Sequence, residues 1–263
     1  MKFDLMREFR EHLRSEYGKN TADKYYFAVK SLFDGLNFDS AQEICGEEVQ
    51  RRMAKVKTKN DYSAAKCGLK QFSACFPAFD LPGESFFSEG SKHKRNFKKR
   101  IFEPVKLDTI KRKINGMQNN RLKIAYRLML ASGARVSEVA ALKSEDIEID
   151  GYNVSIRIEN GKGGKSRVIS NIEDEYLSRE LPRLMEASAA GENIFDSAGH
   201  MKNEAGELGL ECHDLRRAFS KVYLRRQKEA APDYETAKQN VMDAMGHESY
   251  RTTKRYIKRK IEI

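Results

Sequence analysis

Near its C-terminal end the chain reads HDLRR at residues 213–217, then MGH at 245–247, and then a tyrosine at 256 within a strongly basic stretch. On a helix, His213 and Arg216 are three positions apart and therefore share one face. His247 follows a glycine, which is typical of the end of a helix. The region gathers two imidazoles, a guanidinium and a phenol among lysines and arginines, and this combination suits a phosphodiester substrate.

The composition points to a partner that is a polyanion. The 263 residues include 49 Lys and Arg against 39 Asp and Glu, for a net charge of +10. Charge alone does not separate nucleic acid from an anionic membrane, but no apolar run approaches membrane-spanning length. The amphipathic, charged N-terminus is not a signal peptide. The four cysteines, Cys45, Cys67, Cys75 and Cys212, have no Cys-x-x-Cys spacing, so reduced thiols in a cytoplasmic protein are expected.

Residues 1–81 are predicted to form a small four-helix unit. Apolar residues recur at helical spacing from Phe3 to Leu13, and Thr21 is a candidate N-cap for the next helix. Further helices are expected at about 40–56 and 61–76. The aromatic residues of this unit are expected in its core.

A basic linker is expected at residues 82–103, where Pro82-Gly83 and the sequence SEGS at 88–91 are typical of turns and linkers. Six cations lie within nine residues that contain no acid: Lys92, Lys94, Arg95, Lys98, Lys99 and Arg100. The alternatives are a solvated linker and a strap along a phosphate backbone. The strap is favoured because helical patterning resumes on both sides.

Residues 104–263 are predicted to form a second domain, and the chain as a whole to be mainly α with a small antiparallel sheet. Helices are expected at 107–114, 121–132, from 135, and at 174–187, 213–230, 234–245 and 250–260, with short strands at 147–149, 154–158 and 167–169. The sequence GKGGKS at 161–166 is not a phosphate-binding loop, because Glu159 stands where that motif needs glycine and no helix follows. A tight hairpin with Lys162 near its tip is expected instead.

Four motifs in this order resemble those of the tyrosine recombinases, the phage-integrase family. GARVSEVAAL at 133–142 is similar to the family's first arginine box, and GKGGKSR at 161–167 to its β-hairpin lysine segment. HDLRR at 213–217 matches its His-x-x-Arg box, while MGH at 245–247 with Tyr256 matches its terminal box. The resemblance covers about residues 104–258 and implies a two-domain architecture, with a helical core-binding (SAM-like) DNA-binding domain at 1–81 and a catalytic domain at 104–263.

The residue types fit the chemistry of such an enzyme. A phenol has a pKa near 10, so Tyr256 needs positioning and a proton acceptor before it attacks phosphorus. Arg135 and Arg216 are suited to grip the non-bridging phosphate oxygens. His213 is a candidate general acid or base, and His247 a candidate hydrogen-bond donor to the phosphate. No carboxylate cluster suited to magnesium is seen, so no metal and no other cofactor are expected.

Other roles are implied by the resemblance. Lys162 is expected to give a proton to the departing 5′-oxygen, and Glu138 to orient neighbouring groups. A covalent 3′-phosphotyrosine would store the bond energy, so that ligation needs no ATP. Two alternatives stay open: Tyr250 in place of Tyr256 as nucleophile, and Lys165 in place of Lys162.

The sequence therefore predicts a site-specific recombinase or integrase of a mobile element, with double-stranded DNA as its partner. The alternatives are a topoisomerase of type IB chemistry and a DNA-binding protein that kept this fold without catalysis. Arg216 and His247 are 31 positions apart, more than in many relatives, and the chain stops seven residues after Tyr256. The family's terminal docking helix is thus expected to be absent, giving a monomer in solution and a tetramer on paired DNA sites. Whether Tyr256 acts in its own site or in a neighbour's stays open.

Overall fold

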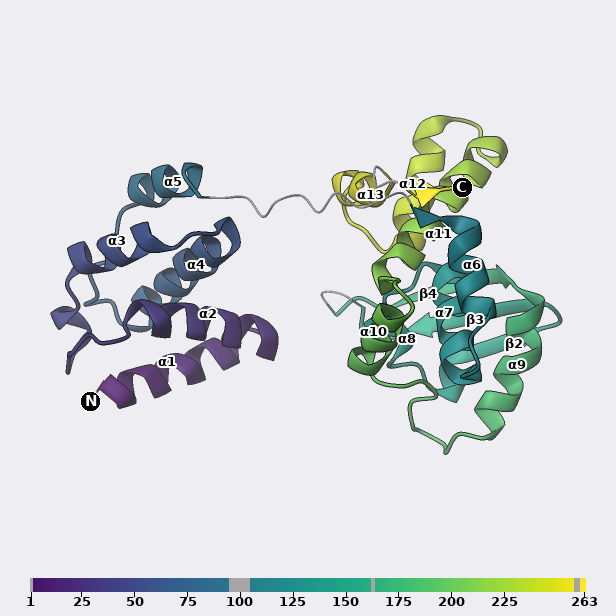
Figure 1. The fold of residues 1–263 in the computed structure, drawn as a ribbon, viewed down its shortest axis with the longest axis horizontal. Coiled ribbons are helices and arrows are strands. Elements are labelled where there is room, and N and C mark those ends of the chain that lie inside the picture. The colour runs from purple at the N-terminus through teal and green to yellow at the C-terminus, as the bar shows by residue number, and fades with distance from the viewer. Residues whose placement is uncertain (1, 95–104, 162–163, 258–260) are drawn as a thin grey trace. The chain divides into compact units, whose positions relative to one another are not determined.

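A computed structural model describes residues 2–94, 105–161, 164–257 and 261–263 (Figure 1). Internal contacts divide the chain into two compact units, Met1–Ile101 and Phe102–Ile263. Both are largely helical, and the second contains a small antiparallel sheet, so the predicted fold class is confirmed. No helix in the described parts of the chain is both long and apolar enough to span a membrane.

The first unit is built around an aromatic core. Its described elements are α1 (Lys2–Glu16), α2 (Lys19–Leu32), the 3-10 helix η1 (Ala41–Glu43), α3 (Gly46–Lys55), α4 (Lys59–Cys75) and α5 (Glu84–Lys92). Phe72 of α4 is fully buried and lies 5.1 Å from the Phe9 ring and 5.0 Å from the Phe33 ring, measured between ring centroids. Both pairs meet edge to face, the arrangement that aromatic quadrupoles favour. The expectation that these aromatics form the core is confirmed.

Two details of the first unit differ from the prediction. Gly18, and not Thr21, occupies the N-cap of α2, so Thr21 lies in the first helical turn. The helix expected at 40–56 is interrupted, because the Glu43 carboxylate accepts hydrogen bonds from the Asp39 N–H and the Ser40 hydroxyl and closes a short 3-10 turn. Cys45 then has an extended backbone, and α3 begins only after it.

The expectation of a linker at residues 84–92 is wrong, because α5 packs on the first unit. Phe87 is 1% exposed, and the Glu84 carboxylate forms an ion pair with Lys66 at 2.7 Å. The sequence is typical of a linker because of Gly90, yet a Cβ at Gly90 would lie 2.1 Å from the Tyr62 hydroxyl. Glycine thus permits close helix packing here.

Lys94 also belongs to the first unit and is not an open phosphate contact. Its ammonium donates to the backbone carbonyls of Ala54 (2.7 Å) and Met53 (3.3 Å) at the C-terminal end of α3. A cation in this position stabilises the helix end. Lys92 is exposed and lies 3.3 Å from Glu89. The other strap residues, Arg95, Lys98, Lys99 and Arg100, lie outside the described residues.

The second unit has a three-stranded antiparallel sheet flanked by helices. Its described elements are β1 (Val105–Lys106), α6 (Leu107–Asn115), α7 (Asn120–Ser132), α8 (Val136–Val139), η2 (Ser144–Asp146), β2 (Ile147–Asp150), β3 (Asn153–Ile158), β4 (Arg167–Glu173), α9 (Glu175–Glu186), α10 (Ala198–Glu207), α11 (Cys212–Ala230), α12 (Tyr234–Met245), α13 (Tyr250–Ile257) and β5 (Ile261–Glu262). The sheet order is β2-β3-β4, and Ile156 of β3 pairs with Ile147 on one side and Ile169 on the other. The predicted hairpin therefore joins β3 to β4.

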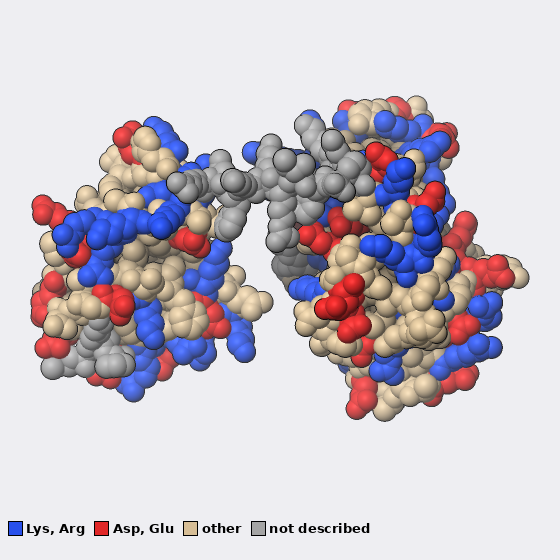
Figure 2. All heavy atoms as spheres, in the orientation of Figure 1, with Lys and Arg blue, Asp and Glu red and all other residues tan. Residues whose placement is uncertain are grey.

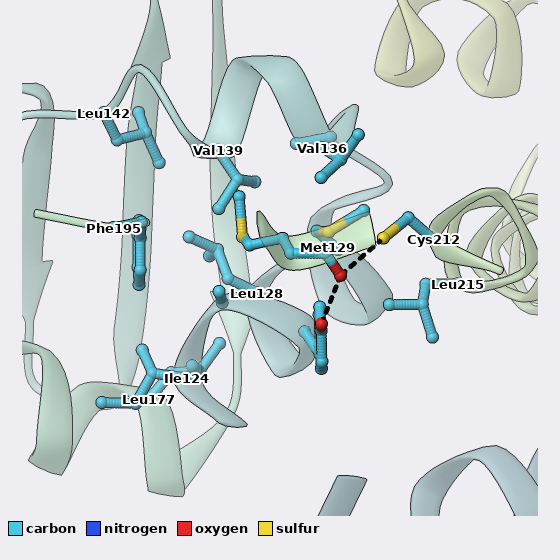
Figure 3. Packing of buried hydrophobic residues seen from close by; sticks show 14 of the residues in the cluster. Ile124, Leu128, Met129, Val136, Val139, Leu142, Leu177, Phe195, Cys212 and Leu215 are labelled. Carbon is cyan, nitrogen blue, oxygen red and sulfur yellow. Dashed lines mark hydrogen bonds between the residues drawn. The ribbon is translucent and has the colours of Figure 1, made fainter. Parts of the chain in front are cut away.

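The core of this unit joins α8 to α11 through α7, which packs against both. Figure 3 shows Met129 and Leu128 of α7, Val136 and Val139 of α8, and Cys212 and Leu215 of α11 converging in one cluster of buried side chains. These elements carry the arginine box and the His-x-x-Arg box. Apolar packing therefore brings two motifs that are about 80 residues apart to one place.

The helix expected at 250–260 is described as far as Ile257. The described part of α13 ends at Ile257, residues 258–260 are not described, and Ile261–Glu262 form β5, which pairs in parallel with β1. Neither this two-stranded pairing nor α10 was predicted. Two-residue strands have no periodicity to detect, and α10 buries only Met201 and Ala205.

Candidate active site

The loop between α7 and α8 places the first arginine. Gly133 ends α7 with a φ of +68°, a left-handed conformation, and a Cβ there would lie 2.2 Å from the Phe219 ring of α11. Arg135 occupies the N-cap of α8. Glu138 accepts hydrogen bonds from the Arg135 backbone N–H (2.7 Å) and from its guanidinium (2.6 Å). The Arg135 side chain is therefore fixed by an ion pair within its own helical turn.

Arg216 of α11 is completely buried and ties together three segments of the unit. One terminal nitrogen donates to the Gly133 carbonyl, and the other to the Met245 carbonyl and to His247 Nε2, which lies 3.0 Å away. Burial, followed by the positive charge of Arg135, lowers the pKa of Arg216 to about 10. The guanidinium therefore still carries its charge at neutral pH.

His247 is placed by the C-terminal end of α12, where Gly246 adopts a φ of +58°. Its Nδ1 lies 2.9 Å from the hydroxyl of Thr253, a fully buried residue of α13. An arginine only donates hydrogen bonds, so Nε2 must accept from Arg216, and Nδ1 must carry the proton and donate to Thr253. This contact ties α12 to the helix that carries Tyr256.

Tyr256 is the tyrosine that the fold brings to the other predicted residues. Its half-buried ring lies 5.2 Å from the His247 ring and 6.0 Å from the His213 ring, and the Arg216 guanidinium carbon lies 5.6 Å from its centroid. These four side chains come from α11, from α13 and from the turn between α12 and α13. They form one cluster within a single chain.

Tyr250 is engaged elsewhere. Its hydroxyl lies 3.4 Å from the Tyr234 hydroxyl, and the Lys238 ammonium lies 5.1 Å from its ring centroid. Burial, followed by the hydrogen bond with Tyr234, raises the pKa of Tyr250 to about 12. The geometry therefore favours Tyr256 over Tyr250 as a nucleophile.

His213 lies at the second position of α11 and is exposed. Partial desolvation, followed by the positive charges of Arg217 and Arg216, lowers the pKa of its imidazole. Arg217 is itself held by Asp214 at 2.5 Å and Glu211 at 3.4 Å. His213 is thus neutral at physiological pH and able to accept a proton.

A cavity of about 310 Å³ opens beside this cluster, and its walls include Arg135, His213 and Arg216. Lys202 of α10 also lines it, a residue that belongs to none of the four motifs. A larger cavity of about 650 Å³ lies among α7, β4, α11 and α12. Among the described residues that line the larger cavity, none is a predicted catalytic residue, so the smaller cavity is the one suited to a phosphate group.

Comparison with known proteins shows which family the chain resembles. Residues 105–200 match the family model described as the phage integrase family, a range that contains both the first arginine box and the hairpin. Tyrosine recombinase XerA of Pyrococcus horikoshii is 24% identical over 274 residues, which cover 97% of this chain and 89% of the relative. Over nearly its whole length the chain is similar to a tyrosine recombinase. Tyrosine recombinase XerD of Mycobacterium tuberculosis is 29% identical over 157 residues, which cover 52% of this chain and 47% of the relative.

Solved structures of two integrases have the same fold as this chain. A lambda integrase dimer bound to a COC′ core site has a TM-score of 0.63 at 16% identity and covers 97% of this chain and 94% of that one. The Tn1549 transposon integrase in complex with transposon right end DNA has a TM-score of 0.61 at 11% identity, with coverage of 97% and 95%. At these identities the likeness concerns the fold alone.

The structure describes only one of the two hairpin lysines, Lys165. Lys162 lies outside the described residues. Lys165 is exposed and forms an ion pair with Glu248, the residue directly after His247. The hairpin tip is closed by hydrogen bonds from the Gly161 N–H to the Lys165 carbonyl and from the Gly164 N–H to the Gly161 carbonyl, both 2.9 Å. Because Lys165 already has a carboxylate partner, Lys162 remains the candidate that the motif suggests.

Two residues in the cluster were not predicted from the motifs. Thr253 orients His247, as described above. Arg167, the first residue of β4, donates two parallel hydrogen bonds to the Glu138 carboxylate, at 2.9 and 2.7 Å. Burial alone would raise the pKa of Glu138, but hydrogen bonds from Arg167 and Arg135 outweigh it and lower this pKa to about 2. The only signal for Arg167 in the sequence was its position at the end of the hairpin motif.

Proposed function

We propose that this protein is a site-specific DNA recombinase that cuts and rejoins duplex DNA through a 3′-phosphotyrosine at Tyr256. The observation that carries the proposal is the convergence of Tyr256 with His213, His247 and Arg216 beside a cavity that Arg135 also lines. A phenol, two imidazoles and two guanidiniums supply a nucleophile, proton carriers and positive charge for one phosphodiester.

In the proposed cleavage step, the Tyr256 oxygen attacks phosphorus, and the bond from phosphorus to the 5′-oxygen breaks. The phenol proton passes to a neighbouring base, for which neutral His213 is suited by position and by its lowered pKa. Lys162 protonates the departing 5′-oxygen. Ligation reverses these steps with a 5′-hydroxyl as nucleophile, so no ATP is consumed.

The two arginines stabilise the negative charge that grows on the non-bridging oxygens. Arg135 lines the cavity, with its side chain fixed by Glu138. Arg216 lies beneath the Tyr256 ring, and its terminal nitrogens already donate to backbone carbonyls. Arg216 also lines the smaller cavity, so its charge acts on a phosphate held there.

A nicked DNA substrate tests the proposed function. Target sites are first recovered by sequencing the DNA that copurifies with the protein from cells. A nick beside the expected cleavage position releases a short fragment after cleavage, so ligation is blocked and the adduct accumulates. A protein–DNA band on a denaturing gel is expected; a DNA-binding protein without catalysis would give none. Recombinant products from paired sites distinguish a recombinase from a topoisomerase.

We propose further that the natural substrates are the ends of a mobile element, as the resemblance to integrases implies. Copurified DNA should then map to the two ends of one element and to its insertion site. A single chromosomal site, with no element beside it, would contradict this proposal.

Cleavage is expected to persist in excess EDTA. The positive charge at the scissile phosphate is assigned to Arg135 and Arg216, which chelators do not remove. The measurement is adduct formation on the nicked substrate, with and without EDTA. Loss of the adduct with EDTA, and its return with added magnesium, would refute the assignment of charge stabilisation to the arginines.

We propose that the basic strap lies along the DNA backbone. Lys94 is left out of this proposal because its ammonium caps α3. Neutralising Arg95, Lys98, Lys99 and Arg100 together should weaken binding to all DNA sequences alike. It should also reduce the slope of log affinity against log salt by about 0.9 for each phosphate that the variant no longer neutralises. Lys94→Met is the matched control and should leave the slope unchanged. An unchanged slope in the fourfold variant would show that the segment is only solvated.

We propose that the protein is a monomer without DNA and assembles only on DNA with paired sites. Figure 2 shows Lys and Arg spread over the visible face of each unit among fewer Asp and Glu, and the net charge of +10 opposes self-association. DNA phosphates would neutralise this charge. Light scattering at moderate salt, with and without paired sites, tests the proposal. A stable tetramer in the absence of DNA would contradict it.

A further inference from the structure

Arg167 is a strongly buried cation next to the candidate site, and the motifs provide no role for it. Its side chain is 15% exposed, and that of its partner Glu138 is 2% exposed. Both terminal nitrogens of Arg167 bind the carboxylate, one to each oxygen. Such a fork fixes the plane of the carboxylate as well as its position.

The same carboxylate holds Arg135. Glu138 Oε1 accepts from the Arg135 guanidinium at 2.6 Å, and Oε2 accepts from the Arg135 backbone N–H at 2.7 Å. Arg167 thus fixes the group that in turn fixes a proposed phosphate-binding arginine. Breaking the fork would remove two of the four hydrogen bonds described above for Glu138, so the orientation of its carboxylate, and with it that of Arg135, would be less fixed.

Two glycines pack against Arg167, and each directly precedes a proposed catalytic residue. A Cβ at Gly161, before Lys162, would lie 3.2 Å from an Arg167 terminal nitrogen. A Cβ at Gly246, before His247, would lie 3.2 Å from Arg167 Cδ and Nε. The Arg167 side chain therefore lies between the base of the lysine hairpin and the turn that carries His247.

The charges around Glu138 make its ionisation depend on Arg167. The described cations that face it are Arg135 from α8, Arg167 from β4 and Arg216 from α11. One carboxylate in this cluster offsets part of the repulsion among three guanidiniums. Burial opposes ionisation of Glu138, and the hydrogen bonds from Arg167 are the strongest counterweight.

We propose that Arg167 is a positioning residue for strand cleavage, which aligns Arg135 and His247 by clamping Glu138 and packing against Gly161 and Gly246. The inference rests on the proposed function. Arg167 does not touch the phosphate and acts through these neighbours. A role confined to the sheet would instead require its contacts to lie along β3 and β4.

The test compares Arg167→Gln and Arg167→Lys with Arg157→Gln. Arg157 is on β3 of the same hairpin, where it pairs with Asp146 at 3.6 Å, away from the cluster. The rate of adduct formation is measured in single turnover on the nicked substrate at saturating protein. Arg167→Gln should slow cleavage about 100-fold, as small misplacements of catalytic groups do, with DNA affinity close to that of Arg157→Gln. Its melting temperature should be lower than that of Arg157→Gln, because the buried Glu138 carboxylate loses a partner, so the rates are compared at a temperature where both variants are folded. Arg167→Lys keeps the charge without the fork and should be intermediate.

The pH profile separates positioning from general stability. Without Arg167 the pKa of Glu138 should rise. The measured quantity is the ratio of the variant's cleavage rate to the wild-type rate at each pH. This ratio should fall as the pH is lowered through the raised pKa of Glu138, because the protonated carboxyl no longer holds Arg135. Titration of His213 occurs in both proteins and cancels in that ratio. In a Glu138→Gln background, Arg167→Gln should cause a smaller further loss than in the wild type, from its contacts at Gly161 and Gly246 alone, and no acidic limb.

The outcomes distinguish this inference from the proposed function. A wild-type protein that forms no adduct on its recovered sites overturns both. A cleaving wild type with an equally fast Arg167→Gln variant overturns the inference alone, as do additive losses from Arg167→Gln and Glu138→Gln. If Arg167→Gln fails to fold, Arg167→Lys decides by the same rate and pH profile.

Discussion

Replacing Tyr256 with phenylalanine is expected to abolish the covalent DNA adduct, with a loss of roughly 10⁴-fold or more in cleavage, as for removal of other enzymatic nucleophiles. The change deletes only the phenolic oxygen. The ring keeps its place beside the rings of His213 and His247, so DNA affinity and melting temperature should stay close to those of the wild type. The measurement is adduct formation on the nicked substrate, with a binding titration on the same DNA.

Tyr250→Phe is the matched control on the same helix. Its hydroxyl contacts Tyr234 and is not part of the cluster, so the adduct should persist. An adduct that survives Tyr256→Phe and disappears with Tyr250→Phe would show that Tyr250 is the nucleophile.

Replacing Arg216 with lysine is expected to damage both cleavage and stability. Lysine has three donors on one atom and cannot reach the Gly133 carbonyl, the Met245 carbonyl and His247 together. Cleavage should fall by about 10³-fold, as when a charge-stabilising donor is removed. The free energy of unfolding should fall by about 3 kcal/mol, because buried acceptors lose their donors.

Arg217→Lys is the neighbouring control. Arg217 binds the carboxylates of Asp214 and Glu211, which an ammonium also satisfies, so losses should be small in both assays. Urea unfolding and single-turnover cleavage measure the two quantities. Equal stability and equal cleavage in Arg216→Lys and wild type would contradict the central role given to this arginine.

The motifs predicted which residues lie in the cluster, but not the hydrogen bonds and burial that hold those residues in place. His213 and Arg216 were placed on one helix by their spacing, and Gly246 correctly marked the end of α12. The burial of Arg216 was not predictable, because it depends on carbonyls of Gly133 and Met245 that lie 83 and 29 positions away. Arg167 and Thr253 were missed for the same reason: their partners are distant or are themselves placed only by tertiary packing.

The sequence-based predictions were wrong where the local composition favours one structure and tertiary contacts stabilise another. The segment at 84–92 contains serines and Gly90, yet it forms α5 because Gly90 lets the helix approach Tyr62 and Phe87 enters the core. Lys94 was expected to be part of a basic strap and instead caps α3. The β1–β5 pairing joins residues more than 150 positions apart through two-residue strands. In each case the stabilising contact is invisible to a local pattern.

The most direct test of the account is to identify the residue that becomes attached to DNA. The adduct from the nicked substrate is digested with protease and nuclease, and the modified peptide is sequenced by mass spectrometry. We expect a nucleotide joined through its 3′-phosphate to the oxygen of Tyr256. Attachment at any other residue, or to a 5′-phosphate, would contradict it.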